Sequence, residues 1–221
     1  FYDASGRMTH VVAPEGTVIS GVPTAGYIKN TYDARGNVTE VRQVAKSGSG
    51  LADLVTSAIY PASCSNPIVC NKPTSTTDAK GATTDYVYDA THGGVLSVTA
   101  PAPTSGAVRP QTRFTYTSLS TYYYATATTR AAGVAAYKLT GVSSCRTISS
   151  CAGTSDETKV TITYETGSAS VGANLLPISA TQASGDGTLS ATTARTYDNI
   201  GNVLTVDGPL AGSQEARSSR G

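Results

Sequence analysis

Tryptophan is absent from this chain of 221 residues, and other large apolar side chains are scarce, with two Phe and one Met. Charged residues make up only 14% of the sequence, below the ~25% of typical soluble domains. Ser, Thr, Gly and Tyr take their place, and such a mixture is unsuited to a thick core. It favours a thin, extended β-sheet, because Thr, Val and Tyr pack well on a pleated surface. Disorder is the competing explanation for a chain rich in Ser, Thr and Gly, but the regular placement of Tyr and Val argues against it.

Neither sign of charge dominates, since 16 Lys and Arg residues face 15 Asp and Glu residues without clustering. This balance removes the electrostatic case for binding nucleic acid or an anionic membrane surface. No apolar run approaches the roughly 18 residues that a membrane span needs, and no charged-then-apolar leader opens the chain. Because the chain begins with Phe1 and stops at Gly221 without a recognisable terminal element, we expect it to be an excerpt of a longer protein, with any targeting signal upstream.

Residue patterns typical of catalysis are also missing. The chain has two histidines, His10 and His92, and contains no Gly-x-Ser-x-Gly elbow, no glycine-rich phosphate loop and no His-x-x-x-His pair. We expect His10 on a strand and His92 in a turn, as ordinary sheet or surface residues. The prediction is a chain that is not an enzyme, with no catalytic residue, no metal and no cofactor.

What is present is a recurring tyrosine, in most cases followed by an acidic residue. Tyrosines stand at 32, 60, 88 and 116, each 28 residues after the last. Ahead of them the residues alternate, with Thr84, Tyr86 and Tyr88 on one face of an expected strand and Val87 on the other. The aligned segments are Tyr2-Asp3-Ala4-Ser5-Gly6-Arg7, Tyr32-Asp33-Ala34-Arg35-Gly36-Asn37, Tyr88-Asp89 to Gly93-Gly94, Tyr164-Glu165 to Gly167, and Tyr197-Asp198-Asn199-Ile200-Gly201-Asn202.

The Asp-x-x-Gly sequence that follows the tyrosine predicts a tight hairpin turn. Aspartate at the first position can accept a backbone N–H two residues on, and glycine at the fourth tolerates a positive φ. A three-residue loop with a glycine bulge is the expected form, and Gly36 and Gly201 are expected at positive φ. Turns are predicted at 3–6, 33–36, 89–94 and 198–201. The structural turn residues are Asp3, Gly6, Asp33, Gly36, Asp78, Gly81, Asp89, Asp198 and Gly201. Recurring once per turn, these aspartates are better explained by backbone capping than by catalysis.

A second strand follows each turn. Val38 and Val41 do not share a face under strict alternation, so either a bulge intervenes or both faces are partly covered. Proline ends this strand because it cannot donate to the ladder. The prolines in this position are Pro14, Pro101 and Pro209.

These motifs resemble the Rhs/YD-repeat family, whose repeat reads Tyr-Asp-x-x-Gly-(Arg/Asn)-hydrophobic-Thr-x-Val before a Pro/Gly turn. The match is specific at 2–16, 78–101 and 197–209, good at 32–41, and degenerate at 116 and 164. The resemblance implies an all-β fold in which consecutive antiparallel hairpins form one continuous spiralling sheet, part of a shell or extended scaffold. The family includes insecticidal toxin-complex cocoons, Rhs effectors, wall-associated bacterial proteins and animal teneurins. Membership implies containment rather than catalysis.

The resemblance gives the chain one domain over 1–221, a single array of repeats belonging to a larger protein. Its implied role is a structural, non-enzymatic segment of a large secreted or cell-surface protein that encloses a toxin or another C-terminal cargo. The expected partners are the neighbouring repeats of its own polypeptide and the enclosed domain, and no self-cleavage residues are matched. The alternative is a surface adhesin or carbohydrate-binding module, with cell-surface glycans as partners. The units lie near 2–28, 29–56, 57–84, 85–112, 113–160, 161–193 and 194–221.

Four cysteines form two identical Cys-x5-Cys spacings, and this suggests one insertion that occurs twice. The gaps are wider than the usual zinc knuckle. Two local disulfides, Cys64 with Cys70 and Cys145 with Cys151, are favoured over free thiols and over a metal site. Oxidised cysteines imply an extracytoplasmic compartment, so the expected location is extracellular or at the cell surface.

The tyrosines allow two interpretations. Their placement before each turn favours cross-strand packing at Tyr2, Tyr32, Tyr88, Tyr164 and Tyr197, while sugar stacking is the alternative. The three residues 122–124 form the aromatic cluster outside a repeat and are the best candidates for binding a sugar. Asn37 begins a glycosylation sequon, but it occupies a turn position, and we interpret it as structural.

Overall fold

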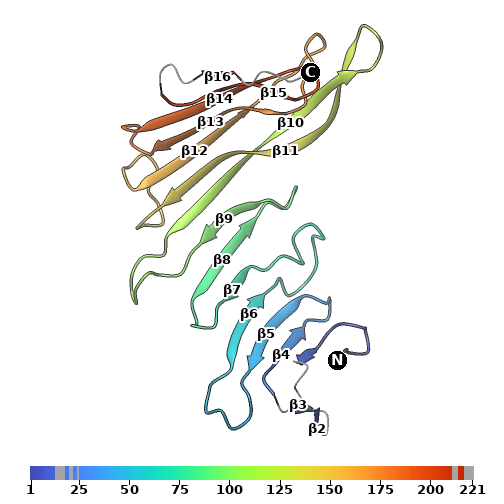
Figure 1. The fold of residues 1–221 in the computed structure, drawn as a ribbon, viewed down its shortest axis with the longest axis vertical. Coiled ribbons are helices and arrows are strands. Elements are labelled where there is room, and N and C mark those ends of the chain that lie inside the picture. The colour runs from blue at the N-terminus through green and yellow to red at the C-terminus, as the bar shows by residue number, and fades with distance from the viewer. Residues whose placement is uncertain (13–17, 20–21, 24, 211–213, 217–221) are drawn as a thin grey trace. The chain divides into compact units, whose positions relative to one another are not determined.

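A computed structural model describes residues 1–12, 18–19, 22–23, 25–210 and 214–216. The described part of the chain is all-β, and none of its elements is a helix long and apolar enough to cross a membrane. The chain divides into two compact units, Phe1–Ser105 and Gly106–Gly221. Figure 1 shows each unit as a series of neighbouring strands. The predicted all-β fold with antiparallel pairing is therefore confirmed.

In the first unit, consecutive strands pair antiparallel in one sheet ordered β1-β4-β5-β6-β7-β8-β9, and a short β2–β3 pair stands apart. The hairpins meet the sequence expectation, since the turns at 33–36 and 89–94 join neighbouring strands. Pro14, one of the predicted strand terminators, lies outside the described residues. The strands are β1 (His10–Val12), β2 (Val18–Ile19), β3 (Val22–Pro23), β4 (Tyr27–Tyr32), β5 (Val38–Val44), β6 (Leu54–Ile59), β7 (Ser75–Thr77), β8 (Thr83–Tyr88) and β9 (Val95–Thr99).

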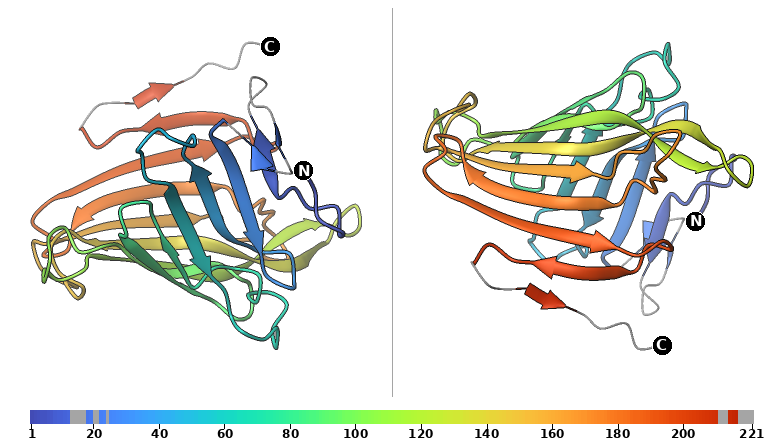
Figure 2. Two further views of the ribbon diagram at one scale, coloured as in Figure 1. Left: turned by 90° about the horizontal axis from the view of Figure 1, so that it is seen from below. Right: turned by 90° about the horizontal axis from the view of Figure 1, so that it is seen from above.

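The second unit follows the same plan, with strands β10 to β16 paired antiparallel in chain order. Figure 2 shows β11 to β15 side by side within one layer of this unit. The β10–β11 hairpin is the longest, and its tip extends beyond the neighbouring strands (Figure 1). The strands are β10 (Gln111–Tyr124), β11 (Arg130–Cys145), β12 (Glu157–Tyr164), β13 (Pro177–Ser184), β14 (Ser190–Tyr197), β15 (Val203–Asp207) and β16 (Gln214–Ala216).

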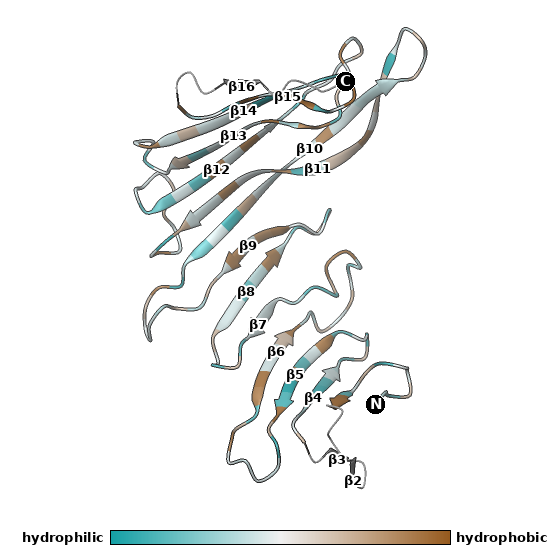
Figure 3. Cartoon of the chain, in the orientation of Figure 1, coloured by the Kyte–Doolittle hydropathy of each residue, from teal (hydrophilic) through white to brown (hydrophobic). Residues whose placement is uncertain are grey.

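Both faces of these strands are only partly buried. In β5 and β13 nearly every residue is half-buried, without the alternation that one buried face would give. Hydrophobic and hydrophilic residues accordingly mix along the strands in Figure 3. Among the described residues the buried apolar side chains are Cys70, Cys145, Cys151, Ala173 and Leu175. Three of these belong to disulfides, so covalent links and backbone hydrogen bonds take the place of a thick core.

The strand directions give each sheet two ends. Because neighbouring strands run antiparallel, the connections that follow β4, β6 and β8 lie at one end of the first unit. The repeat tyrosines Tyr32 and Tyr88 are the last residues of β4 and β8, and Tyr60 directly follows β6. We call this the tyrosine end of the first unit. In the second unit, the tyrosine end carries the β10–β11 tip, loop 165–176 and turn 198–202.

Candidate functional site: the tyrosine turns, disulfide loops and tyrosine cavity

The Asp198 turn shows the geometry common to the Asp-x-x-Gly loops. The backbone N–H of Asp198 donates to the carbonyl of Asn202 at 2.9 Å, and the Gly201 N–H donates to the Asp198 carbonyl at 3.1 Å. One carboxylate oxygen of Asp198 accepts the N–H groups of Ile200 and Asn202 at 3.0 and 2.8 Å, and the other accepts the Asn202 side-chain amide at 2.8 Å. This is the capping role predicted from the sequence. Equivalent backbone closure and capping occur at Asp3, Asp33, Asp78 and, in a longer loop, Asp89.

Hydrogen bonds also hold several of these carboxylates in their charged form. The side-chain amide of Asn37 keeps the pKa of Asp33 below its ordinary value, and Asn202 does the same for the pKa of Asp198. Backbone N–H groups are the leading cause of the lowered pKa at Asp3 and Asp89. A general acid or base needs a pKa near the operating pH. The pKa shifts at these turns run in the opposite direction, away from neutral pH.

The turn glycines adopt the conformation that the sequence predicts. Gly36 and Gly201 have φ values of +89° and +91°, in the left-handed region where a Cβ is disfavoured. The prediction of positive φ at these two positions is confirmed. The other predicted turn glycines with positive φ are Gly6 and Gly81.

Loop 165–176 is a longer form of the same turn. The Glu165 N–H donates to the Leu176 carbonyl at 2.9 Å, and the Glu165 carboxylate accepts the N–H groups of Asn174 and Leu176 at 3.1 and 3.4 Å. The residue in the left-handed region is Leu175, with φ +56°, and not Gly167, where the sequence places the motif glycine. Insertion of residues into the loop moves this position, and burial of the Leu175 side chain offsets its backbone strain.

A β-bulge occurs at five of the recurring tyrosines; four of them end a strand beside a turn, and Tyr116 lies within β10. Tyr32 pairs with Val38, but Thr31 pairs with Glu40, so the second strand carries one extra residue. Val41 pairs with Asn30, two residues before Tyr32. Val38 and Val41 therefore lie on the same face of the sheet. Of the two alternatives that the sequence leaves open, the bulge is observed, and the half-buried residues on both faces of β5 agree with the other as well. The same register shift occurs at Tyr88, Tyr116, Tyr164 and Tyr197.

Three of these tyrosines bind the backbone of the neighbouring segment. Their hydroxyls donate to main-chain carbonyls at 2.7 to 2.9 Å, from Tyr32 to Met8, from Tyr164 to Leu139 and from Tyr197 to Pro177. Cations also lie over the rings: Arg7 is 5.0 Å from the Tyr32 centroid, Lys138 is 5.1 Å from that of Tyr164, and Lys72 is 5.4 Å from that of Tyr88. Each ring therefore joins its own hairpin to the segment beside it.

The Cys64–Cys70 disulfide closes a loop at the tyrosine end of the first unit. The Arg35 guanidinium donates to the carbonyls of Pro61 and Cys70 at 2.6 and 3.4 Å, and so ties turn 33–37 to this loop. On the other side, the Asn66 amide donates to the Ala90 carbonyl at 2.8 Å. The disulfide loop thus joins two Asp turns that are far apart in the sequence.

The Cys145–Cys151 disulfide closes a loop between β11 and β12, at the end of the second unit opposite turn 198–202. Its position differs from that of Cys64–Cys70, which lies at a tyrosine end, so the idea of one insertion occurring twice is wrong in structural terms. Glu157 is the buried charged residue of the described chain, 4% exposed. Its carboxylate accepts the Ser143 hydroxyl and the Gly153 N–H, and these bonds, the Ser143 hydroxyl first, lower its pKa.

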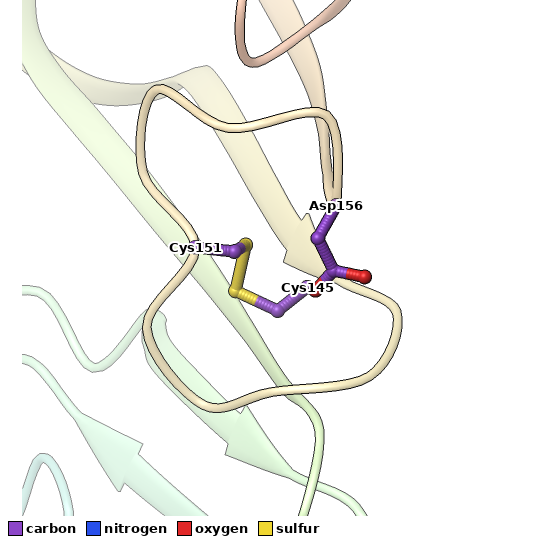
Figure 4. A group of neighbouring side chains, drawn as sticks. All are labelled: Cys145, Cys151 and Asp156. Carbon is purple, nitrogen blue, oxygen red and sulfur yellow. A yellow bond between two sulfur atoms is a disulfide. The ribbon is translucent and has the colours of Figure 1, made fainter.

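Asp156 lies beside the Cys145–Cys151 bridge (Figure 4). The two sulfurs and a carboxylate oxygen lie within 4.8 Å of one another. However, the sulfurs are bonded to each other and therefore offer no thiolate to a metal. Asp156 instead accepts the Thr147 hydroxyl at 2.8 Å. This cluster fits a loop anchor better than a metal centre.

The histidines and the sequon asparagine occupy their predicted structural positions. His10 begins β1 and packs against the rings of Phe1 and Tyr27. His92 lies in the Asp89 turn, where its Nδ1 accepts the Gly94 N–H at 3.1 Å. The Asn37 amide donates to Asp33 at 2.8 Å, an interaction that glycosylation would disrupt.

The residues 122–124 line a cavity of about 550 Å³ within the second unit. It lies among the β10–β11 tip, loop 165–176 and turn 198–202, and the loop beside the hairpin tip can be followed in Figure 2. Backbone hydrogen bonds in both directions between Tyr122 and Ala173, at 3.0 and 3.2 Å, hold the loop on the hairpin. The sequence identified the tyrosines but missed Arg130 and Asn174, because loop insertion and hairpin length decide which residues meet them.

No family model and no curated protein sequence matches the chain. A porin-like protein from Bacteroides uniformis is 14% identical, with 91% of this chain and 92% of that chain covered and a TM-score of 0.26. A TcdB2-TccC3-Cdc42 structure is 14% identical with a TM-score of 0.20 and 94% of this chain covered; the chain spans 15% of the length of that neighbour. Likenesses at these TM-scores assign neither a family nor a function.

Proposed function

We propose that this chain is a structural, non-enzymatic segment of a large secreted or cell-surface protein of the Rhs/YD-repeat type. In this proposal its sheets form part of the wall of a β-shell or extended scaffold, which encloses a toxin or another C-terminal cargo. The partners are neighbouring repeats of the same polypeptide and the enclosed domain.

The observation that carries the proposal is the recurrent tyrosine turn. A capped loop and a β-bulge accompany the tyrosines that end β4, β8, β12 and β14, and three of these four tyrosines donate a hydrogen bond to the neighbouring segment. Each such unit adds one hairpin to the preceding one, so an array can be extended by further copies, as in repeat proteins. The turn carboxylates are engaged by backbone N–H groups, so their regular appearance needs no catalytic explanation.

The sparse core supports the same proposal. Fully exposed apolar side chains include Val134, 95% exposed, and Ile200, 82% exposed. A domain whose strands are only half-buried gains little hydrophobic stabilisation from its own packing, so neighbouring segments would supply more. The two disulfides suit an oxidising compartment, which supports a secreted or cell-surface location.

The test compares this chain with a form extended by two further hairpins at each end, taken from the surrounding coding region. We expect the extended form to unfold at a higher temperature and to resist limited proteolysis at the turns of this segment. A coding region limited to this chain, or an extension that changes neither property, would contradict the proposal.

A further inference from the structure

The tyrosine cavity of the second unit lies among three segments, two of which are joined directly. Backbone hydrogen bonds in both directions between Tyr122 and Ala173 hold loop 165–176 on the β10–β11 tip, and the Tyr122 ring packs closely on Gly167. Turn 198–202 supplies the third side. The volume of about 550 Å³ falls within the roughly 300–1,000 Å³ of small-molecule pockets. The cavity therefore has room for a small ligand.

One cation already lies against the aromatic lining of the cavity. The Arg130 guanidinium stands 4.1 Å from the Tyr124 ring centroid and donates to the Tyr124 hydroxyl at 2.6 Å. Tyrosine rings attract cations because the face of the ring carries negative charge. Tyr123 and Tyr124 both line the cavity and are 56% and 63% exposed. Aromatic surface is thus left for a second cation.

Two carboxylates from different segments line the same cavity, Glu165 of the loop and Asp198 of the turn. Both backbone N–H groups that bind Glu165 reach Oε2, and within the described chain its Oε1 has no hydrogen bond. In Asp198, Oδ1 accepts two backbone N–H groups, whereas Oδ2 accepts the Asn202 amide alone among the described residues. An ionised carboxylate offers about four acceptor sites, so both groups can accept further hydrogen bonds.

The charges of the lining are not balanced. Arg130 brings one positive charge, but its guanidinium binds neutral groups, the Tyr124 hydroxyl and the Ser170 carbonyl at 2.8 Å, and forms no ion pair with either carboxylate in the described chain. Two negative charges and one positive charge leave the lining with a formal charge of −1. Coulomb attraction favours a cationic ligand here and disfavours an anionic one.

The carboxylates also indicate which kind of cation fits. A primary ammonium group has three N–H donors for carboxylate oxygens, whereas a trimethylammonium group has none. Since Glu165 and Asp198 belong to separate segments, a ligand with an ammonium group at each end can bind both. An alkyl chain between the two ends has apolar surface to bury against the tyrosine rings.

We propose that this cavity binds a linear polyamine. One ammonium group donates to Oε1 of Glu165 and another to Oδ2 of Asp198, while the alkyl chain between them packs on Tyr123 and Tyr124. This activity goes beyond the scaffold function, because a wall segment needs no small-molecule ligand.

Isothermal titration calorimetry of the whole chain with putrescine, cadaverine and spermidine tests the proposal. We expect at least one of the three to bind at low ionic strength, and the affinity to fall as salt is added. Glu165→Gln should weaken binding by about tenfold, because a hydrogen bond between two charged groups becomes one to a neutral amide. Glutamine keeps an oxygen for the backbone N–H groups of the loop, so the unfolding temperature should not change.

Asp198→Asn is the second variant and should also weaken binding by about tenfold. It serves if Glu165→Gln disturbs the loop, since Asp198 caps a separate turn. The matched ligand control is 1,5-pentanediol, in which hydroxyls replace both ammonium groups of cadaverine. It should not bind.

Asp186→Asn is the matched protein control. It removes one negative charge from the second unit, but Asp186 lies in the turn between β13 and β14 and does not line the cavity. Its affinity for the polyamine should equal that of the wild type. The proposal is overturned if none of the three polyamines binds, or if Glu165→Gln and Asp198→Asn bind as tightly as the wild type. An equal loss in Asp186→Asn and Glu165→Gln would overturn it too, because the attraction would then be to the charge of the whole chain.

Discussion

Glycine at the fourth position of the turn meets a backbone demand that residues with a Cβ meet only at a cost. At Gly201 an added Cβ would stand 3.5 Å from the Leu176 side chain, an ordinary contact, so space is not the obstacle. The obstacle is the φ of +91°. Strain and steric crowding can therefore be separated at this position.

Gly201→Val is expected to destabilise the second unit by roughly 1 kcal/mol or more, because a β-branched side chain at this φ crowds the backbone. A loss of 1 kcal/mol lowers the unfolding temperature of a 100-residue unit by roughly 4–8 °C, which calorimetry resolves. Tyr197→Ala is the comparison, since it removes packing and the hydroxyl bond to Pro177 but leaves the turn glycine in place. An unchanged unfolding temperature in Gly201→Val would show that the turn mechanism is wrong.

The turn carboxylates predict a defined dependence on pH. The native pKa of Asp198 is lowered, chiefly by the Asn202 amide, relative to about 3.9 for an unfolded Asp. Below that unfolded value the unfolded state binds more protons than the native state. The stability contributed by the cap is therefore present above pH ~4 and is lost as the pH falls through the lower native pKa.

Thermal unfolding between pH 7 and pH 2 measures this effect. The wild type should lose stability below pH ~4, and Asp198→Asn, which keeps an acceptor oxygen but cannot titrate, should lose less over the same interval. Parallel curves for the two proteins would mean that the Asp198 carboxylate has no part in the acid response.

At the scale of single residues, the sequence predicts what a local motif determines. Asp198 and Gly201 take their predicted roles because a turn is decided by about five neighbouring residues. Leu175 could not be predicted, since its left-handed backbone depends on the inserted loop and on burial. Glu157 was missed for a similar reason: its burial depends on the pairing of β12 with two neighbouring strands.

At the scale of elements, the Cys64–Cys70 loop connects two hairpins. The loop accepts a hydrogen bond from Arg35 of turn 33–37, and it donates one to the carbonyl of Ala90 in turn 89–94. It also packs against Gly93, where no added Cβ would fit beside Ile68. The loop is thus held from both sides, and its loss should affect both turns.

Replacing Cys64 and Cys70 together by Ser should lower the stability of the first unit by about 2 kcal/mol, the value for closing so short a loop. Hydrogen exchange should quicken at both turns 33–37 and 89–94. The matched control replaces Cys145 and Cys151 by Ser, which should leave exchange at these two turns unchanged. Exchange that quickens only within 61–74 would show that the loop does not join the turns.

The cysteine pairs also show which features of a loop can be predicted from the spacing of its residues. Equal Cys-x5-Cys spacings predicted both disulfides, because a short loop returns on itself wherever it occurs. They did not predict the location of the loops, since that depends on the direction of the strand that leads into each pair. β6 runs toward a tyrosine end and β11 runs away from one, so the two bridges lie at different ends of their units.

At the scale of the whole molecule, the pairing pattern implies how the sheet would continue. Phe1 already exchanges backbone hydrogen bonds with His10 on β1, at 3.0 and 3.4 Å. This is the pairing that residues before a tyrosine make in the other hairpins. Residues upstream of Phe1 would therefore extend a strand along β1.

Electron cryo-microscopy of the polypeptide encoded by the complete gene tests the scaffold proposal most directly. We expect flanking strands to pair with β1 and β16, and this segment to form part of a β-wall whose interior holds a C-terminal domain. A free-standing domain in which β1 and β16 are unpaired edges, with no further tyrosine turns on either side, would contradict it.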